Sequence, residues 1–377
     1  MGLGIYIHIP FCRTKCNYCH FVIRPWKAAT ADRYRKALVR EIGQFFARGQ
    51  WTEEVDSIYF GGGTPSLVPV EDIYEILATC KGSLPVSRDC EISLESNPGT
   101  LSADKVNSYN QMGINRVSIG AQSFDDDELA SLGRDHTGDQ VTESVGLLRQ
   151  CRIENVNLDL MLGLPGQTEE CWSRDMTSLA AIAPPHISLY MLDLHERSPL
   201  FHQVAKGRCT IPGDDLIADM YLCALTRFAD CGYEQYEISN FAQAGYQCRH
   251  NLKYWLREPV LGFGVGSHSY DGRRRYANFR SMDAYLETVE RGEEPVEWRE
   301  DVKAPRAFEE MMFLGLRLNR GLDWQRVSRE YDSRQLEKFE SSLREMTEEG
   351  LLEWQDSVIR LTPRGMLLSN EVFQKFV

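Results

Sequence analysis

Three cysteines near the N-terminus carry the strongest chemical signal in the chain. Cys12, Cys16 and Cys19 have the spacing C-x3-C-x2-C and directly follow an apolar segment that predicts a strand. Thiolates are the usual ligands of iron-sulfur clusters, and a cubane cluster contains four irons. Three cysteines therefore leave one iron of a 4Fe-4S cluster without a protein ligand. Such an iron could bind a small molecule and take part in chemistry.

A structural zinc site is the main alternative for these thiols. Such sites usually have four ligands, often as two C-x2-C pairs, and the chain has no second pair of this kind. His20 could provide a fourth ligand, but it directly follows Cys19, and neighbouring side chains in an extended segment point apart. The spacing therefore favours the iron-sulfur cluster.

The chain has 377 residues and a formal net charge of -13. Its length predicts a large α/β domain with a smaller domain appended. The negative charge argues against binding to nucleic acid or anionic membranes, because both need clustered positive charge. We find no signal peptide and no apolar segment near the ~20 residues of a transmembrane segment, so we expect a cytoplasmic protein. The eleven cysteines then predict metal ligation and buried thiols, not disulfides.

Short apolar segments alternate with amphipathic segments over the first half of the chain. The expected strands are Ile5–Ile9, Val55–Phe60, Cys90–Glu95, Arg116–Ile119, Val156–Met161 and Ile187–Met191. The expected helices are Ala31–Phe46, Val70–Cys80, Ala103–Met112, Asp139–Cys151 and Thr168–Ala181. Repeated βα units predict a parallel sheet, and six of them fit a partial (β/α)6-type barrel of the α/β class. Sites in such barrels lie at the carboxyl ends of the strands.

Glycines and a carboxylate stand where the second and third strands end. Gly62, Gly63 and Thr64 follow the second strand, and successive glycines let backbone amides approach a ligand closely. Glu95 ends the third strand, where a solvent-facing carboxylate would also be unremarkable. Its position at a strand end favours a functional role.

The fourth and fifth strands add further polar residues. Gln122 follows the fourth strand, and Asp159 lies within the apolar fifth strand. A carboxylate in a buried strand needs a partner or a ligand. Arg134 is a candidate for that partner, although it could equally be a surface arginine.

The cysteine spacing, the strand before it and Tyr18 in the last gap resemble the radical S-adenosylmethionine (SAM) superfamily. The resemblance implies that the open iron binds the amino and carboxylate groups of SAM. It also implies that an electron from the cluster cleaves SAM into methionine and a 5'-deoxyadenosyl radical, so that the cofactors perform the difficult chemistry.

Six segments narrow the resemblance to one family. In chain order they are YIHIPFC, YFGGGTPS, SLESNPGT, INRVSIGAQSF, SLGRDH and DLMLGLPGQT, and together they span about residues 4 to 190. They resemble oxygen-independent coproporphyrinogen III oxidase and its paralogue, the haem chaperone HemW. The resemblance implies that Tyr6, Gly62 and Glu95 contact the cluster-bound SAM. It implies that Gly63, Thr64, Gln122, Arg134 and Asp159 line a second SAM position.

Phe21, in the cysteine loop, bears on which member of this family the chain resembles. The oxidase has a further cysteine two residues after the third, where this chain has Phe21, which is similar to the HemW pattern. At the position of His20 that pattern usually has Asp. His20 is therefore either a neutral replacement or a ligand to haem or cluster.

Residues 250–255 match the HNxxYW motif of HemW, whose histidine is implicated in holding haem. This resemblance makes His250 the expected haem ligand. Imidazole binds iron, and flat aromatic rings pack well against a porphyrin. The alternative is that His250, Tyr254 and Trp255 form a packed aromatic cluster.

The C-terminal part has a different character. We expect helices at Ala307–Leu318, Asp323–Tyr331 and Ser333–Gly350, and then a hairpin of Leu351–Trp354 and Val358–Leu361. This order resembles a winged-helix module, which the family also has at its C-terminus. From Glu300 onward there are 12 basic and 15 acidic residues, so the module lacks the charge of a DNA reader. The expected domains are 1–235 (radical SAM partial barrel), 236–298 (connecting segment) and 299–377 (winged-helix-like).

Together the motifs predict a haem chaperone that binds a 4Fe-4S cluster and SAM and transfers haem to haem-accepting apoproteins. A reductant such as flavodoxin or ferredoxin is a further expected partner, and nucleic acid is not. The alternative is a radical SAM enzyme acting on a porphyrin, although Phe21 argues against decarboxylation of coproporphyrinogen III. An unrelated radical SAM enzyme or a structural metalloprotein is the third possibility.

Overall fold

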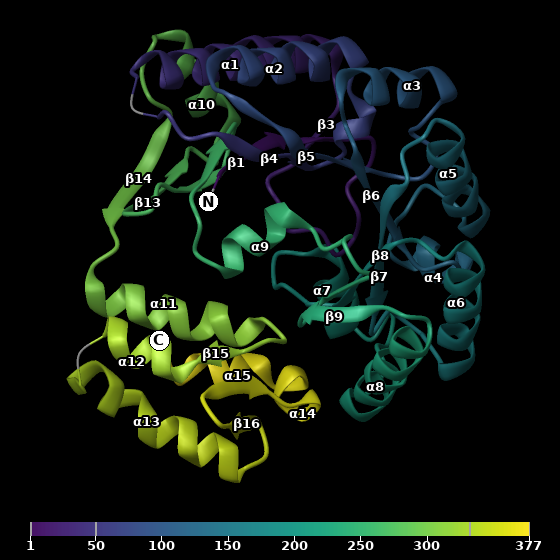
Figure 1. The fold of residues 1–377 in the computed structure, drawn as a ribbon. Helices are drawn as coiled ribbons and strands as arrows, with labels where there is room; N and C mark the ends of the chain where they lie inside the picture. The colour runs from purple at the N-terminus through teal and green to yellow at the C-terminus, as the bar shows by residue number, and fades with distance from the viewer. Residues whose placement is uncertain (1, 50, 332, 377) are drawn as a thin grey trace.

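A curved sheet organises the computed structural model, which describes residues 2–49, 51–331 and 333–376. The sheet has 12 strands in the order β14-β13-β12-β11-β1-β4-β5-β6-β7-β8-β10-β9. Its central strands are parallel, namely β1 (Leu3–Ile9), β4 (Val55–Gly62), β5 (Val86–Ser96), β6 (Arg116–Gln122), β7 (Asn155–Leu162) and β8 (His186–Met191). The edge strands β14 and β9 do not pair with each other, so the sheet is a partial barrel, as predicted (Figure 1).

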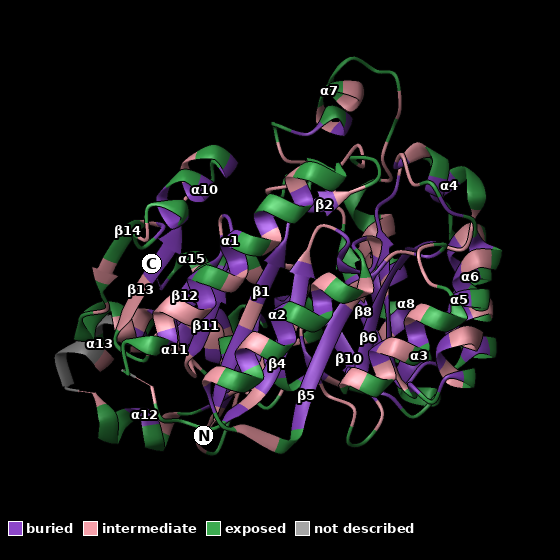
Figure 2. Ribbon diagram, turned by 90° about the horizontal axis from the view of Figure 1, so that it is seen from above, coloured by how far each residue is buried: buried purple, intermediate pink, exposed green. Residues whose placement is uncertain are grey.

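All six predicted strands are confirmed, and each lies within one of these parallel strands. The reason is their composition, because β-branched and apolar residues fill both faces of a strand that is covered on each side. β6 is buried along its whole length, and β1 is buried except at Tyr6. Figure 2 shows the central strands as mostly buried behind helices whose outer faces are exposed.

The five predicted helices of the first half are also confirmed. They are α1 (Ala28–Ala47), α2 (Val70–Ser83), α3 (Ala103–Met112), α5 (Gly138–Gln150) and α6 (Glu169–Ile182), and they cover the convex face of the sheet (Figure 1). Side-chain caps set the N-terminal ends of α3, α5 and α6. In α3 the Ser102 side chain accepts from the Lys105 N–H, and Gly113 ends the helix with a φ of 94°.

The residues between 236 and 298 extend the main sheet. They contribute β10 (Asn240–Ala242), β11 (Val260–Phe263), β12 (His268–Tyr270) and β13 (Arg274–Asn278), and α9 (Arg249–Trp255) and α10 (Met282–Glu290) accompany them. β9 (Glu234–Glu237) and β14 (Val296–Asp301) complete the two edges. β11 runs parallel to β1, whereas β12, β13 and β14 continue antiparallel. α9 lies on the concave side of the sheet (Figure 1).

The C-terminal part packs below the barrel in Figure 1. Its helices are α11 (Ala304–Arg317), α12 (Trp324–Glu330) and α13 (Ser333–Glu348), followed by the hairpin β16 (Leu352–Gln355) and β17 (Val358–Leu361). The predicted order of three helices and a hairpin is thus confirmed. A short strand, β15 (Leu322–Asp323), adds to the hairpin, and α14 (Pro363–Leu367) and α15 (Ser369–Gln374) end the fold. Across the described ranges, no helix is long and apolar enough to cross a bilayer.

Candidate functional site

The three predicted cluster cysteines lie in one loop at the carboxyl end of β1. Cys12 ends β2 (Phe11–Cys12), which pairs with β3 (Arg24–Pro25) and so anchors the loop. The Cys19 N–H donates to the Cys16 carbonyl at 3.2 Å, which closes a turn. All three thiols are free and partly buried, and they line one cavity of about 350 Å³. Among the described residues, no three His, Cys, Asp or Glu side chains are grouped around a single-ion site of the zinc type.

This cavity brings together most of the residues that the sequence predicts for cofactor binding. It lies where β4, β5, β6 and β7 end, because parallel strands present their carboxyl ends at the same edge of a sheet. The predicted residues that line it are Cys12, Cys16, Cys19, Gly62, Gly63, Thr64, Glu95, Gln122, Arg134 and Asp159. Two predicted residues, Tyr6 and His250, do not line it.

The glycines after β4 have a different role from the predicted one. The N–H groups of Gly62, Gly63 and Thr64 all donate within the protein. Their acceptors are Glu95 Oε2, Ile9 O and Phe11 O, at 2.9, 2.8 and 2.8 Å. These three amides are therefore not free to donate to a ligand in this structure. A Cβ at Gly63 would lie 2.7 Å from the Phe11 carbonyl oxygen, so glycine lets β4 approach the start of the cysteine loop.

Glu95 is held rigidly at the end of β5. Its Oε1 accepts from the Tyr59 hydroxyl at 3.0 Å, and its Oε2 accepts from the Gly62 N–H at 2.9 Å. Burial raises the pKa of Glu95 to about 7, and the negative charge of Asp159 acts in the same direction. A half-buried carboxyl with two fixed donors is therefore poised to bind a cationic group.

A chain of hydrogen bonds connects two of the cysteines. Thr64 Oγ1 donates to Cys12 Sγ at 3.6 Å, and Arg134 Nη1 donates to Cys16 Sγ at 3.6 Å. Asn97 joins the two donors, because its Nδ2 donates to Thr64 Oγ1 at 3.2 Å and its Oδ1 accepts from Arg134 Nη2 at 3.0 Å. Hydrogen bonds to ligand sulfurs are one factor that sets the reduction potential of an iron-sulfur cluster.

Asp159 has other partners than the predicted arginine. Its Oδ1 accepts from Asn157 Nδ2 at 2.7 Å, and its Oδ2 accepts from Ser118 Oγ at 3.2 Å. Arg134 instead bonds to Asn97, Cys16 and the carbonyl oxygen of Gly120. The expected pair of Arg134 and Asp159 is therefore wrong. Burial raises the pKa of Asp159, which neutral donors hold at the wall of the cavity.

Gln122 stands at the end of β6 with a φ of 69°, and a buried polar cluster supports the segment that follows it. Ser123 Oγ donates to Glu128 Oε2 at 2.7 Å, and the Phe124 N–H donates to Asp175 Oδ1 at 3.0 Å. Asp175 Oδ2 is buried and has no hydrogen-bond partner among the described residues. Burial raises the pKa of Asp175 to about 7, so this carboxyl resists ionisation in the folded protein.

Asp175→Asn is expected to stabilise the protein, and to do so more strongly at pH 8 than at pH 5. The folded-state pKa of about 7 lies above the ordinary value of 3.8, so the folded protein binds the proton more tightly. The stability that this carboxyl contributes is therefore lost as the pH rises through that window. Asparagine keeps an acceptor for the Phe124 N–H without a charge. We expect a gain of about 1–3 kcal/mol at pH 8, measured by urea unfolding.

The exposed Asp127 provides a matched control in the same segment. Asp127→Asn should change the unfolding free energy little at either pH. An equal effect of Asp175→Asn at pH 5 and pH 8 would contradict the assignment of a buried, uncharged carboxyl.

Tyr6 and His250 belong to an aromatic cluster outside the cavity. The rings of Tyr59 and His250 stack with centroids 5.1 Å apart, and those of Tyr6 and His250 lie 6.3 Å apart. His250 is 1% exposed, and its Nδ1 and Nε2 bond to Ser57 Oγ at 3.0 Å and Tyr254 Oη at 3.1 Å. Burial lowers the pKa of His250 to about 3. The structure therefore places His250, the expected haem ligand, outside the cavity, and both of its nitrogens are hydrogen-bonded.

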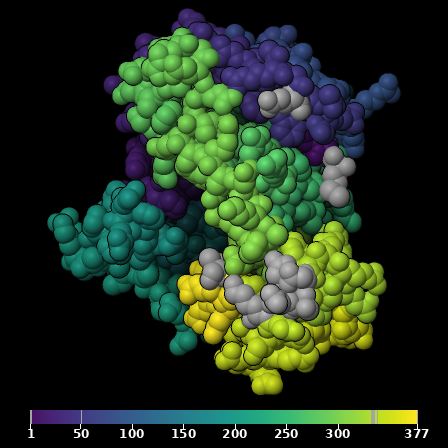
Figure 3. Space-filling view, turned by 90° about the vertical axis from the view of Figure 1, so that its left-hand side faces the viewer, coloured from purple at the N-terminus to yellow at the C-terminus, as the bar shows by residue number. Residues whose placement is uncertain are grey.

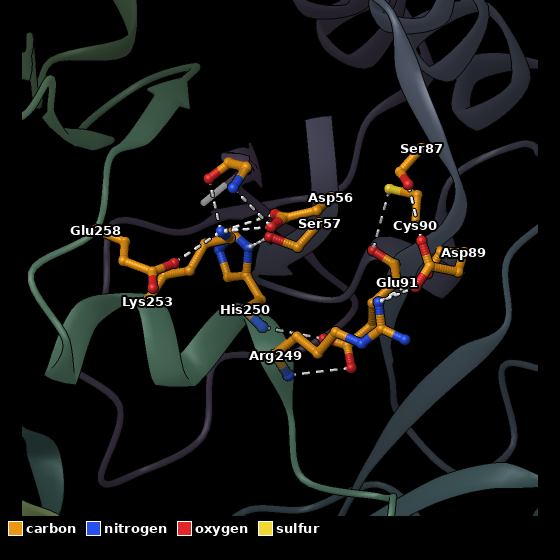
Figure 4. A network of polar contacts seen from close by, with 11 residues as sticks. Asp56, Ser57, Ser87, Asp89, Cys90, Glu91, Arg249, His250, Lys253 and Glu258 are labelled. Atoms are coloured by element: carbon orange, nitrogen blue, oxygen red, sulfur yellow. Dashed lines mark hydrogen bonds and ion pairs between the residues drawn. The ribbon is translucent and has the colours of Figure 1, made fainter. Parts of the chain in front are cut away.

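Helix α9, which carries the HNxxYW motif, is held at its N-terminus by one buried carboxylate (Figure 4). Glu91 accepts from the backbone N–H groups of Arg249 and His250, each at 3.1 Å. Its Oε1 also accepts from Cys248 Sγ at 3.5 Å. A carboxylate at a helix N-terminus satisfies free N–H groups and is favoured by the helix dipole. The motif thus anchors α9 to β5 in this structure.

Lys253 anchors the other end of α9 (Figure 4). Its side chain is 3% exposed, and its Nζ pairs with Asp56 at 2.7 Å and Glu258 at 3.0 Å. The charge of Lys253 is therefore already compensated within the protein. The aliphatic part of its side chain passes Gly4, where a Cβ would lie 2.9 Å from it.

The cavity residues that the sequence analysis missed include Asn97, Ser118 and Tyr190. Asn97 directly follows a predicted strand, so the rule about strand ends could have identified it. Ser118 lies within β6, and its side chain faces the cavity by the two-residue alternation of a strand. Tyr190 had no signal in its local sequence.

Comparison with known proteins agrees with this architecture. The Radical SAM superfamily matches residues 6–179, and the HemN C-terminal domain matches residues 303–368. The crystal structure of coproporphyrinogen III oxidase (HemN) from Escherichia coli superposes with a TM-score of 0.87, covering 100% of this chain and 90% of that one. At 21% identity this likeness defines the fold alone. The open sheet and the cysteine loop at its edge thus define a protein of the radical SAM superfamily.

Similarity in sequence is closer to one group of proteins within the superfamily. Heme chaperone HemW of Bacillus subtilis is 36% identical over 374 residues, which are 99% of this chain and 98% of that protein. HemW of Escherichia coli is 38% identical over 71% of this chain and 69% of its own length. A mitochondrial radical S-adenosyl methionine domain-containing protein 1 of Danio rerio is 30% identical over 98% of this chain and 85% of its own. The chain belongs to the HemW family.

Proposed function

We propose that this protein is a haem chaperone of the cytoplasm that delivers haem to acceptor haemoproteins. The observation that carries the proposal is the similarity to a protein named heme chaperone HemW over 99% of this chain. Relatives of the same name in other bacteria support it. An oxidase acting on coproporphyrinogen III is supported by the fold only, at 21% identity, and is not favoured.

The proposal includes a 4Fe-4S cluster on Cys12, Cys16 and Cys19. These cysteines fit the cluster as ligands, because their three thiols line one cavity. Two of the thiols also accept hydrogen bonds from Thr64 and Arg134. When bound, the cluster and SAM would supply one-electron chemistry, with a reductant such as flavodoxin or ferredoxin as electron donor. The protein itself fixes the cysteine loop through the chain of hydrogen bonds that Asn97 completes.

SAM would occupy the cavity beside the cysteines. Glu95 offers a fixed carboxyl for a cationic group, and Arg134 Nε is buried with no partner among the described residues. An orphaned donor of this kind fits an anionic group of a ligand. The residues that we assign to SAM are Gly62, Gly63, Thr64, Glu95, Gln122, Arg134 and Asp159. Tyr6 is left out of this set, because it does not line the cavity.

Hemin titration of anaerobically reconstituted protein tests the proposed function. We expect saturable binding, seen as a Soret band that grows to about one haem per chain, followed by transfer of that haem to an added apo-haemoprotein. Conversion of coproporphyrinogen III to protoporphyrinogen at a catalytic rate would contradict the proposal, and so would failure to bind hemin. Bovine serum albumin loaded with hemin provides the control for passive release.

A further inference from the structure

Haem, the cargo under the proposed function, needs a side chain that can reach its iron. Imidazole is a common axial ligand of haem. Four of the eight histidines, namely His8, His136, His186 and His250, are buried and hydrogen-bonded within the protein. Of the others, His202 and His268 are exposed away from the cavity, whereas His20 lines it.

His20 lies against a second histidine from another loop. Its ring stacks on that of His195 with centroids 4.9 Å apart and an interplanar angle of 14°. His20 belongs to the cysteine loop, and His195 follows β8 and precedes α7 (Pro199–Ala205). The two loops are joined nearby, because the Leu200 N–H donates to the Asn17 carbonyl at 2.9 Å. The histidine pair thus bridges the two loops at the mouth of the cavity.

The rings of His20 and His195 differ in their hydrogen bonds. This difference gives the two histidines different roles toward haem. His195 Nδ1 accepts from the Arg197 N–H at 3.0 Å, so the proton of the neutral ring is on Nε2. A protonated Nε2 can donate a hydrogen bond but cannot bind iron. The His20 ring has no hydrogen-bond partner among the described residues and is exposed, so a nitrogen lone pair is free.

The surface around the pair suits a flat apolar ligand. Phe21, Tyr190 and Met191 line the same cavity and are 60%, 40% and 39% exposed. Large apolar side chains that are exposed together in one cavity, unlike single exposed ones, mark a surface that binds a ligand or partner. The segment with α7 stands out from the body of the molecule (Figures 2 and 3). A porphyrin could therefore lie on these side chains while one edge stays accessible.

We propose that His20 is the axial ligand that holds haem iron at the cavity mouth, positioned by His195, which stacks on it and donates Nε2–H to a haem propionate. The inference rests on the proposed function and names the cargo site of that function. A ligand on an exposed loop suits a chaperone, because an acceptor protein can approach the iron without unfolding the donor. His250, by contrast, is buried and both of its nitrogens are hydrogen-bonded within the protein.

Hemin binding to single variants tests the assignment. We expect His20→Ala to weaken ferric hemin binding at least tenfold and to change the Soret maximum. His195→Ala should weaken it severalfold, and His195→Phe, which keeps the stacking, should recover part of that loss. His250→Ala and the surface control His202→Ala should bind hemin as the unchanged protein does. Iron and sulfide contents should be equal in all variants, because the cysteines are intact.

Chemical rescue separates ligation from a structural effect. In His20→Gly, added imidazole should restore the Soret maximum, since a free imidazole can occupy the vacated ligand position. Unchanged binding in His20→Ala, with loss of the band in His250→Ala, would overturn the inference and leave the proposed function intact. Loss of the Soret band in His20→Gly that added imidazole does not restore would also overturn the inference. Failure of the unaltered protein to bind hemin would overturn the proposed function as well.

Discussion

Replacement of Cys12, Cys16 or Cys19 by Ala is expected to remove most of the iron-sulfur cluster while the barrel stays folded. A cubane held by three thiolates has no spare protein ligand, so each substitution leaves an unstable two-ligand site. After anaerobic reconstitution, iron and sulfide should be about four each per chain in the unaltered protein and close to zero in each variant. The cysteines are partly buried loop residues outside the main hydrophobic core, so far-UV circular dichroism should not change.

Cys223→Ala is the matched control, because Cys223 is a free, exposed thiol on α8 (Asp214–Asp230), far along the chain from the loop. It should retain the full cluster. Stoichiometric zinc in place of iron, or full cluster content in all three loop variants, would refute the assignment of these thiols.

The central sheet could be predicted from sequence because its signals are local. Each parallel strand is a short apolar run, and each of these helices shows an amphipathic period. Ala103–Met112 was predicted to the residue, since Ser102 and Gly113 mark its two ends. By contrast, the short strands β12 to β14 were not predicted, because their pairing is set by antiparallel neighbours and not by a run of apolar residues.

The location of the candidate site could be predicted because the carboxyl ends of parallel strands meet at the same edge of a sheet. Glu95, Gln122 and Asp159 come from three strands, and the parallel sheet places them around one cavity. Their partners were not predictable. Asp159 bonds to Asn157 and Ser118 instead of Arg134, because the choice among nearby donors depends on side-chain directions that spacing does not encode.

The environment of His250 could not be predicted from its local sequence, and the reason is similar. The sequence identified the HNxxYW motif and a helix, and α9 is indeed a helix over Arg249–Trp255. The groups that bury it come from far earlier in the chain, with Ser57 193 residues away and Glu91 159 residues away. A motif of this kind shows that its residues act together, but its surroundings come only from the tertiary fold.

Lys253→Met is expected to lower the free energy of unfolding by about 3 kcal/mol, the largest effect on stability among the substitutions considered. Methionine keeps most of the length and apolar surface of the lysine stem, so the change isolates the charge. The variant leaves Asp56 and Glu258 with no cation between them, and these carboxylates are 32% and 17% exposed. Residual contact with water puts the expected loss at the lower end of the range for broken buried ion pairs. Urea unfolding at pH 7 measures it.

Arg249→Met on the same helix is the control for loss of a cation near the surface. Arg249 pairs with Asp89, and the two side chains are 50% and 74% exposed, so this change should cost at most about 1 kcal/mol. Adding Asp56→Asn to Lys253→Met should recover part of the stability, because it removes one of the two uncompensated charges. If Lys253→Met and Arg249→Met had equal effects, the buried ion pairs would not be what holds α9 in place. A larger loss for Lys253→Met with partial recovery would show that Lys253 stabilises the fold through its ion pairs with Asp56 and Glu258.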